Sequence, residues 1–528
     1  MIGRQSALVV GNSVLGAAQG YVTLFVIARY MGDDLLGARA YALSLVYLLG
    51  VVCRLGFPIT HTRRLARGDD PAASTGAYLL LKLLLTAAFL GLAVTGGWIW
   101  FGYLQNPATD TTLPALWMGA FIVVAQSLRD VPVNSFRGFR LILERESVLF
   151  ANTVVTMAGT VAVAVAYANS HARWAPWPQA ADAVTRLLGV DAPMGRDAAL
   201  FALMLAFLVG EVVALALAYA LFLRRRIPVG RPNPAVLRDY VRSTVPLMVL
   251  TLGAVLTKRV SEVMLGFWWS AAELGRFAAA AKLSELLLVL ASGVTIVLLP
   301  VVAELHARQD REGLRRTVLE VERWVSLLVW PIVVFVALHA RAILHILLSD
   351  DFLPASGILV LLCVHSLVAS LRMPLQTKAL GLGADRFAGQ VALATVAVNI
   401  LLNTLLIPER IGPLRLAGLG ATGAAWAALG SGFVTLLAYR RQAHEWTGHP
   451  YLSRHLVLHA LAAGATYAAF RLTDLSGLLP EVERFYDLAW SAALVATVYV
   501  AALAVLRELR QQDLRGVWAL VRGAQTPK

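Results

Sequence analysis

Seven basic side chains lie inside long apolar runs of this 528-residue chain, where a charge is costly. They are Arg54, Lys82, Arg129, Lys258, Arg259, Lys282 and Arg372. A charged residue near the centre of a bilayer costs about 2.5–3.5 kcal/mol on insertion scales, so such residues normally face a bundle interior or a wet cavity. Arginine and lysine also bind phosphate oxygens well. We therefore predict that these residues line a polar chamber for an anionic headgroup, such as a pyrophosphate.

A second interpretation of the same cations needs no ligand. Long basic side chains within a turn or two of a span end can extend to the interface. Four of the seven fall in the end third of their span: Arg54, Lys82, Arg129 and Arg372. Lys258 is also spaced to pair with Glu262, and Lys282 with Glu285, along one helix face. Both interpretations stay open from the sequence, and Arg259 is the first residue that we would assign to the chamber.

Three acidic residues within the apolar runs are candidates for ion coupling. Glu211 stands in the middle of one run, and Glu262 and Glu285 lie near the chamber cations. A carboxylate withdrawn from water can exchange a proton or a cation during transport. A structural glutamate that bonds to a neighbouring helix is an equally good interpretation of Glu211.

The composition is that of an integral membrane protein. The chain is 58% hydrophobic and 15% charged, whereas soluble proteins are about 45–50% apolar and about 25% charged. The predicted fold class is an all-α polytopic membrane protein with about fourteen transmembrane helices. The expected spans are 8–28, 38–58, 76–96, 113–133, 147–168, 198–223, 244–266, 275–300, 322–343, 355–375, 387–408, 417–439, 453–473 and 486–507.

The basic residues between the spans predict the orientation. With a cytoplasmic N-terminus, the cytoplasmic segments hold twenty-eight Lys and Arg, and the outer segments hold eleven. Because positive charge accumulates on the cytoplasmic side, we expect both termini there and a location in the cell (inner) membrane. The same distribution explains the net charge of +14 without a nucleic-acid partner.

A basic linker with two prolines divides the chain. Residues 224–242 contain Pro232 and Pro234, which oppose a continuous helix. We expect an N-lobe of spans one to six over 1–223, a C-lobe of spans seven to twelve over 243–441, and two further spans with a tail over 442–528. Such repeated halves are typical of transporters.

The sequence carries no enzymatic or cofactor signature. It has no catalytic serine or zinc-binding motif, no nucleotide-binding glycine loop and no cysteine pair spaced for a metal. We expect neither an enzyme nor a bound cofactor or metal.

Short motifs in order along the chain resemble those of the polysaccharide (O-antigen, Wzx-type) flippases of the multidrug/oligosaccharidyl-lipid/polysaccharide exporter superfamily. They are Ala28-Arg29-Tyr30-Met31-Gly32 with Leu36-Gly37 and Tyr41, Leu55-Gly56-Phe57 with Arg63 and Ala66, Met264-Leu265-Gly266, Glu273-Leu274-Gly275-Arg276-Phe277 with Ala281-Lys282-Leu283, Leu299-Pro300, Asn399 with Asn403, Leu406-Ile407-Pro408, and Gly420-Ala421-Thr422-Gly423-Ala424-Ala425.

The resemblance implies two six-helix lobes in a V shape and alternating access. It implies that a lipid-linked oligosaccharide moves from the cytoplasmic to the outer leaflet. Two departures bear on the substrate. Lipid II flippases of the superfamily carry an Arg-Asp pair in span one, where this chain has Leu24-Phe25, and proton-coupled drug antiporters use a carboxylate there, where it has Asn12 and Gln19.

Three hypotheses follow. The first is a flippase for a polyprenyl-pyrophosphate-linked oligosaccharide, which works as a monomer in the bilayer, with glycan-assembly proteins as further partners. The second is a cation-coupled small-molecule or drug exporter that uses Glu211 or Glu262. The third is a membrane scaffold without transport, in which neutralising the chamber charges has no consequence.

Overall fold

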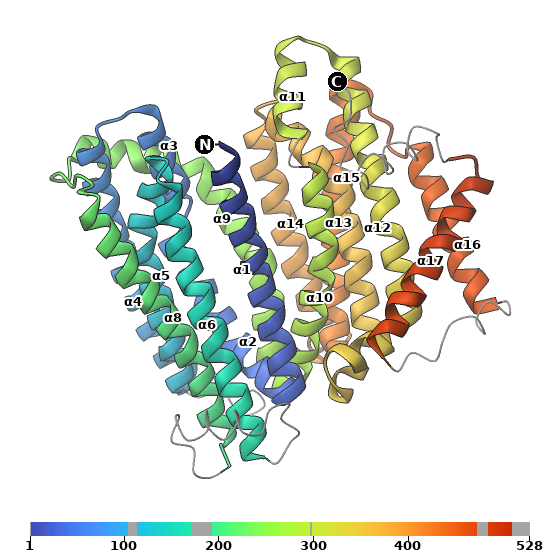
Figure 1. The fold of residues 1–528 in the computed structure, drawn as a ribbon, viewed down its shortest axis with the longest axis horizontal. Helices are drawn as coiled ribbons and strands as arrows, with labels where there is room; N and C mark the ends of the chain where they lie inside the picture. Colours follow the sequence, from blue (N-terminus) through green and yellow to red (C-terminus); the bar gives the residue numbers. More distant parts are fainter. Residues whose placement is uncertain (1, 104–112, 172–192, 296–297, 473–483, 509–528) are drawn as a thin grey trace. The chain divides into compact units, whose positions relative to one another are not determined.

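The computed structural model describes residues 2–103, 113–171, 193–295, 298–472 and 484–508. These residues are almost entirely helical (Figure 1). The helices are α1 (Ile2–Tyr30), α2 (Gly32–Leu49), α3 (Phe57–Arg67), α4 (Pro71–Tyr103), α5 (Leu113–Gly138), α6 (Ile142–Ser170), α8 (Arg196–Arg224), α9 (Pro234–Trp268), α10 (Ala271–Thr295), α11 (Leu298–Ala307), α12 (Arg311–Leu347), α13 (Ser356–Gly381), α14 (Asp385–Leu406), α15 (Gly420–Thr447), α16 (Arg454–Leu472) and α17 (Phe485–Val505). Two 3₁₀ turns, η1 (Gly50–Cys53) and η2 (Asp350–Ala355), and a hairpin of β1 (Arg410–Ile411) and β2 (Leu414–Arg415) complete the list.

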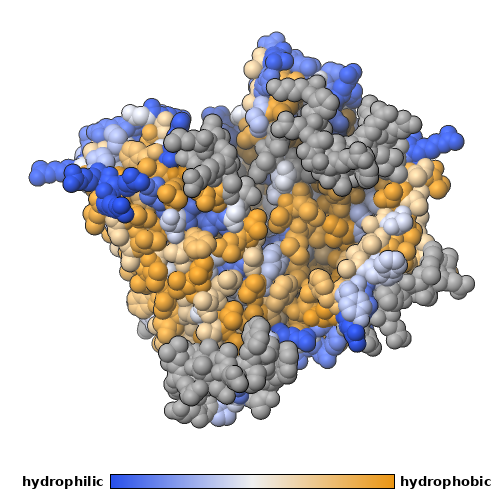
Figure 2. All heavy atoms as spheres, viewed as in Figure 1, coloured by the Kyte–Doolittle hydropathy of each residue, from blue (hydrophilic) through white to orange (hydrophobic). Residues whose placement is uncertain are grey.

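The expected all-α membrane architecture is confirmed. Twelve helices of the described part are long and apolar enough to cross a membrane. A thirteenth span forms if the two parts of α9, which bend by 54° between Val245 and Leu247, count as one. The predicted span 453–473, the thirteenth of the fourteen, is also a helix, α16, but His455, His459 and Arg471 leave it too polar to qualify. On the visible face, hydrophobic residues cover most of the middle of the helices (Figure 2).

The helices group into two compact units. The first contains 1–282 and 389–427, and the second contains 283–388 and 428–528. The lobe boundaries expected at 223 and 243 stay a prediction.

In the first unit, α6 packs between α1 and α8, and α8 also packs on α5 (Figure 1). Small residues let these helices approach closely. A Cβ at Gly159 would stand 2.9 Å from the Cβ of Ala206, and one at Gly210 would overlap Thr156. Close approach through small residues is a common basis of helix association in membranes.

A seam of glycines and buried polar residues joins α2 to α9 and α10 within the first unit. A Cβ at Gly37 would stand 1.7 Å from the Ala271 carbonyl oxygen, and one at Gly275 would stand 1.9 Å from that of Asp33. Each glycine thus packs on the carbonyl four residues before the other. One turn along α2, the buried Tyr41 ring fills the space at Gly266. Arg276 closes the seam's end with an ion pair to Asp33 at 2.8 Å.

The asparagines of the sequence motif hold α14 against α9 in the same unit. The Asn403 side chain donates to the Asn399 side-chain oxygen and to the Ser261 hydroxyl, both at 2.9 Å. The Trp269 indole donates to the Ile407 carbonyl oxygen at 2.9 Å. These motif residues therefore serve helix packing.

The short helix α3 is fastened to the first segment of α9. The His61 ring, which is fully buried, bonds to the Tyr240 hydroxyl at 2.7 Å and to the Ser135 hydroxyl at 3.0 Å. It also stacks on Tyr78 with 4.1 Å between ring centres. Burial, with Arg64 and Lys82 nearby, lowers the pKa of His61 to about 3, so the ring is neutral at physiological pH.

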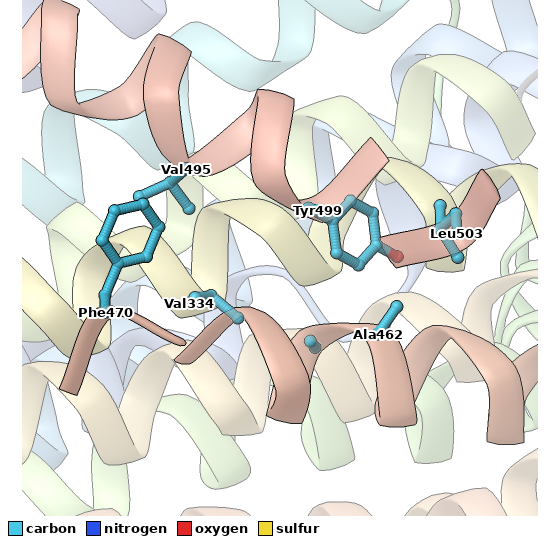
Figure 3. Packing of buried hydrophobic residues seen from close by; sticks show 7 residues of the cluster. Val334, Ala462, Phe470, Val495, Tyr499 and Leu503 are labelled. Atoms are coloured by element: carbon cyan, nitrogen blue, oxygen red, sulfur yellow. The ribbon is translucent and has the colours of Figure 1, made fainter. Parts of the chain in front are cut away.

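The second unit has an apolar core where α12, α16 and α17 meet. Val334 of α12, Ala462 and Phe470 of α16, and Val495 and Tyr499 of α17 are buried there (Figure 3). The adjoining polar layer also carries buried ion pairs. Glu322 binds Arg440, and Arg323 binds Glu508 at 3.0 Å. These pairs satisfy charges that would otherwise be buried alone.

We expect Gly275→Ala to destabilise the first unit, because its new methyl group meets backbone atoms that cannot rotate away. Overpacking of this kind typically costs about 1–3 kcal/mol. The apparent melting temperature of the detergent-purified protein measures the loss. Gly293→Ala, on the same helix and with no atom within 4 Å of its Cβ, is the matched control and should lose nothing. Equal melting temperatures for the two variants would refute close packing at Gly275.

The buried His61 predicts acid sensitivity. Between pH 6.5 and about 3, the unfolded chain protonates this histidine while the folded chain does not, so stability falls as the pH falls, by about 1.4 kcal/mol per pH unit. His61→Gln keeps hydrogen-bonding groups but cannot titrate.

Thermal melts of the detergent-purified protein from pH 7.5 to 5 test this expectation. His61→Gln should lower the melting temperature at pH 7.5 and flatten its decline toward pH 5. The exposed His306→Gln should keep the wild-type slope. An unchanged slope in His61→Gln would rule His61 out as the acid-sensitive group.

A candidate anion-binding cavity in the first unit

Three of the seven predicted cations line one cavity of about 450 Å³ inside the first unit. Its walls come from the end of α2, the turn η1, the middle of α5 and the second segment of α9. The lining residues that matter here are Tyr47, Gly50, Arg54, Gln126, Lys258 and Arg259. These three cations therefore face one cavity whose walls include candidate membrane spans.

A break in the second span positions Arg54. Helix α2 ends at Leu49 and tightens into η1, and then Leu55 and Gly56 adopt positive φ angles of 29° and 78° before α3 begins. A positive φ is strained for leucine and easy for glycine. The break leaves Arg54 exposed in the cavity wall, where its guanidinium donates to the Gln126 side-chain oxygen at 2.9 Å.

Helix α9 supplies the other two cations. The Arg259 guanidinium donates to Glu262 at 2.8 Å and to the Ser44 hydroxyl at 3.2 Å, and it lies 5.1 Å from the centre of the Tyr47 ring. Its side chain keeps 25% of its surface exposed. Lys258 is exposed at the same cavity. Glu262, which the spacing paired with Lys258, accepts hydrogen bonds from Arg259 and Ser44.

The structure places Glu211 in a buried ion pair. Its carboxylate accepts from the Arg129 guanidinium at 2.5 Å, from the Gln126 amide at 2.9 Å and from the Asn152 amide at 3.0 Å. Gln126 links this carboxylate to Arg54, because its amide group bonds to both. Glu211 thus anchors the cavity wall, and its predicted coupling role stays a prediction.

Lys82 is fully buried beside the cavity. Its ammonium donates to the Asp130 carboxylate at 2.8 Å and to the Cys53 carbonyl oxygen at 2.9 Å. Cys53 belongs to η1, so the tightened turn supplies a backbone acceptor. A buried ammonium needs such partners, since desolvation of a lone ion is costly.

The cavity and its surroundings carry excess positive charge. The cations are Arg39, which lies near Arg259 and Tyr47, together with Arg54, Lys82, Arg129, Lys258 and Arg259. Among the described residues, ion pairs join Asp130, Glu211 and Glu262 to members of this set. Six cations against three carboxylates favour an anion in the cavity.

The remaining predicted residues are not among those that line this cavity. Lys282 of α10 has its ammonium 5.1 Å from the centre of the Tyr21 ring of α1. Arg372 lies in α13 of the second unit, and Glu285 lies in the part of α10 that belongs to that unit. Within the described ranges, no three His, Cys, Asp or Glu side chains could hold a metal ion together.

Sequence analysis missed the polar partners of the cations. Gln126 and Asp130 share one face of α5 with Arg129, at a spacing that could have been read from the sequence. Tyr47 and Asn152 gave no comparable signal, because a single polar residue in an apolar run has many possible neighbours. Their roles come from tertiary packing.

Comparisons with known proteins match one segment of this chain to a family model and show a similarity of fold. Residues 193–357 match the family model for "Polysaccharide biosynthesis protein", a stretch that contains Lys258, Arg259 and Lys282. The structure is similar to the lipid II flippase MurJ in an inward closed conformation, with a TM-score of 0.70 and 12% identity over 94% of this chain and 98% of that one.

A second similar structure is the inward-facing conformation of a multidrug resistance MATE family transporter of the MOP superfamily. Its TM-score is 0.62 with 14% identity, over 82% of this chain and 96% of that one. No curated protein matches the sequence. The resemblance inferred from the motifs is confirmed: residues 193–357 match the polysaccharide biosynthesis family model, and the fold is similar to those of MurJ and of a MATE family transporter.

The ion pair of Arg129 and Glu211 should show strong coupling in a double-mutant cycle. Removal of one partner from a buried pair costs about 3–5 kcal/mol, because it leaves an uncompensated charge. We expect Arg129→Met and Glu211→Gln each to lower the melting temperature, and the double variant to recover part of the loss. Strictly additive losses would show that the two side chains do not depend on each other.

Proposed function

We propose that this chain, with the MOP-superfamily fold and a polysaccharide-biosynthesis segment, is a flippase. Its substrate is a polyprenyl-pyrophosphate-linked oligosaccharide, a polysaccharide repeat unit, which it moves from the cytoplasmic to the outer leaflet by alternating access. The observation that carries this proposal is that Arg54, Lys258 and Arg259 line the same cavity among the candidate membrane spans.

The cavity suits a doubly charged phosphate group. A guanidinium offers a planar fork of donors that matches phosphate oxygens, and an ammonium adds a compact charge. Arg54 and Arg259 supply two such forks from different walls, and Lys258 adds the ammonium. A neutral sugar headgroup without phosphate would offer no charge to these three cations.

Internal partners keep these cations in place without a ligand. Gln126 holds Arg54, while Glu262 and Ser44 hold Arg259. An arriving phosphate must compete with these partners, which moderates its affinity. A transported anion must leave as well as enter, so moderate affinity suits a flippase better than tight binding.

The exporter alternative requires a carboxylate that exchanges ions. Glu211 is bonded to Arg129 and Glu262 to Arg259, so a transported cation could bind either carboxylate only by displacing an arginine partner. The positive excess of the cavity also opposes a cationic drug. These contacts favour the flippase.

The proposal extends to the setting of the protein. It lies in the cytoplasmic membrane as a multi-pass protein with both termini in the cytoplasm, as the distribution of Lys and Arg supports. It works as a monomer with its lipid-linked glycan, beside glycan-assembly proteins. The substrate is a polysaccharide unit rather than a peptidoglycan precursor, since span one has Leu24-Phe25 in place of an Arg-Asp pair.

Arg259→Ala should abolish translocation while the protein stays folded. Native mass spectrometry of protein purified from its own membranes should find a polyprenyl-linked glycan on the wild type and none on the variant. Arg259→Lys, which keeps the charge and loses the fork, should retain part of the binding.

Arg316→Ala is the matched control, because this arginine is exposed and lies outside the cavity. It should bind the glycan as the wild type does. Normal translocation by Arg259→Ala would remove Arg259 from the site. Binding of cationic drugs, with no glycan on any variant, would favour the exporter.

A further inference from the structure

An apolar pocket lies next to the cationic cavity in the first unit. It has a volume of about 250 Å³, and α2, α4 and α5 form its walls. Its lining includes Val46, Leu49, Phe89, Gly96, Leu116 and Trp117. Almost no polar surface faces this space, so it suits hydrocarbon and gives water few partners.

The pocket and the cavity follow each other along the same two helices. On α2, Leu49 lines the pocket and Gly50 lines the cavity. On α5, Ala120 lines the pocket and Val123, one turn later, lines the cavity. The two spaces therefore lie within a few turns of each other, at about 1.5 Å per residue.

Gly50 lies at the junction of the two spaces. A Cβ at this position would stand 2.9 Å from the Val123 side chain, a wall of the cavity. It would also stand 3.7 Å from the Phe89 ring, a wall of the pocket. Because residue 50 has no side chain, Val123 of the cavity and Phe89 of the pocket both pack close to its backbone.

A cationic compartment that adjoins an apolar one matches a ligand with an anionic head and a hydrocarbon tail. We propose that this pocket binds the first hydrocarbon units of the ligand, those nearest its phosphate group, while Arg54, Lys258 and Arg259 hold the phosphate. This inference rests on the proposed function and adds to it a specific tail site. The adjacency of the two spaces along α2 and α5 favours the bound ligand's own tail over an unrelated lipid chain.

The glycines of α4 allow the pocket to be filled without touching the cavity. A Cβ at Gly96 has only the Leu49 side chain near it, at 3.7 Å, so Gly96→Leu places a side chain in the pocket without a backbone clash. Gly91→Leu is the matched control, because Gly91 lies on the same helix, outside the pocket, with no atom within 4 Å of its Cβ.

The test compares two ligands that share a head and differ in a tail. Inorganic pyrophosphate and geranyl pyrophosphate are titrated against the full chain in nanodiscs of neutral phosphatidylcholine. In the wild type and in Gly91→Leu, geranyl pyrophosphate should bind at least about tenfold more tightly, since each buried CH₂ adds to binding. Gly96→Leu should remove this advantage and leave the pyrophosphate affinity unchanged.

The other outcomes overturn the inference in distinguishable ways. If the wild type binds both ligands equally, the tail lies elsewhere or a bilayer lipid fills the pocket, and the proposed function stands. If Gly96→Leu weakens both ligands equally, the substitution acts through the fold and the tail site is refuted. If pyrophosphate does not bind the wild type, the proposed function and the tail site both fail.

Discussion

The close contact of Gly37 with Gly275 constrains the rest of the first unit. Backbone meets backbone there, so α2 cannot slide or rotate against α10 without a clash. Along α2, Tyr41 and Ser44 follow Gly37 on the same face, four and seven residues later. Tyr41 fills the space at Gly266, and Ser44 bonds to Glu262 and Arg259. The glycine contact therefore fixes the register at which Arg259 of α9 meets Ser44 of α2. Arg54, which follows η1, lines the same cavity.

The cations in and around the cavity divide into two kinds. Lys82 and Arg129 are each paired with a carboxylate and enclosed by protein, so they stabilise the wall and have little charge left to offer. Arg54 and Lys258 are exposed at the cavity, and Arg259 is partly exposed. Desolvation explains the division, because a fully buried ion must have a permanent partner, whereas one that faces a wet cavity can exchange a partner for a ligand.

The sequence predicted most of the spans, because they depend on local composition. A run of about 20 apolar residues predicts a helix, and a basic residue inside it stands out. The partner of each cation was not predictable in the same way. Helical spacing alone gave no sign that Ser44 of another helix binds Glu262, or that Arg129 of another helix binds Glu211. The bend in α9 and the polarity of α16 also changed the span count, since both depend on details finer than average hydropathy.

The break after α2 connects the two compartments proposed for the ligand. A continuous helix would satisfy its own backbone carbonyls and carry Arg54 past the cavity. In the 3₁₀ turn η1, the Cys53 carbonyl oxygen instead accepts a hydrogen bond from Lys82. Arg54, the next residue, donates one to Gln126. Gly50, the first residue of this turn, is also the point where the apolar and cationic walls meet. One local departure from helical geometry thus places the phosphate-binding cations directly beside an apolar space, which is the arrangement that an amphiphilic anion requires.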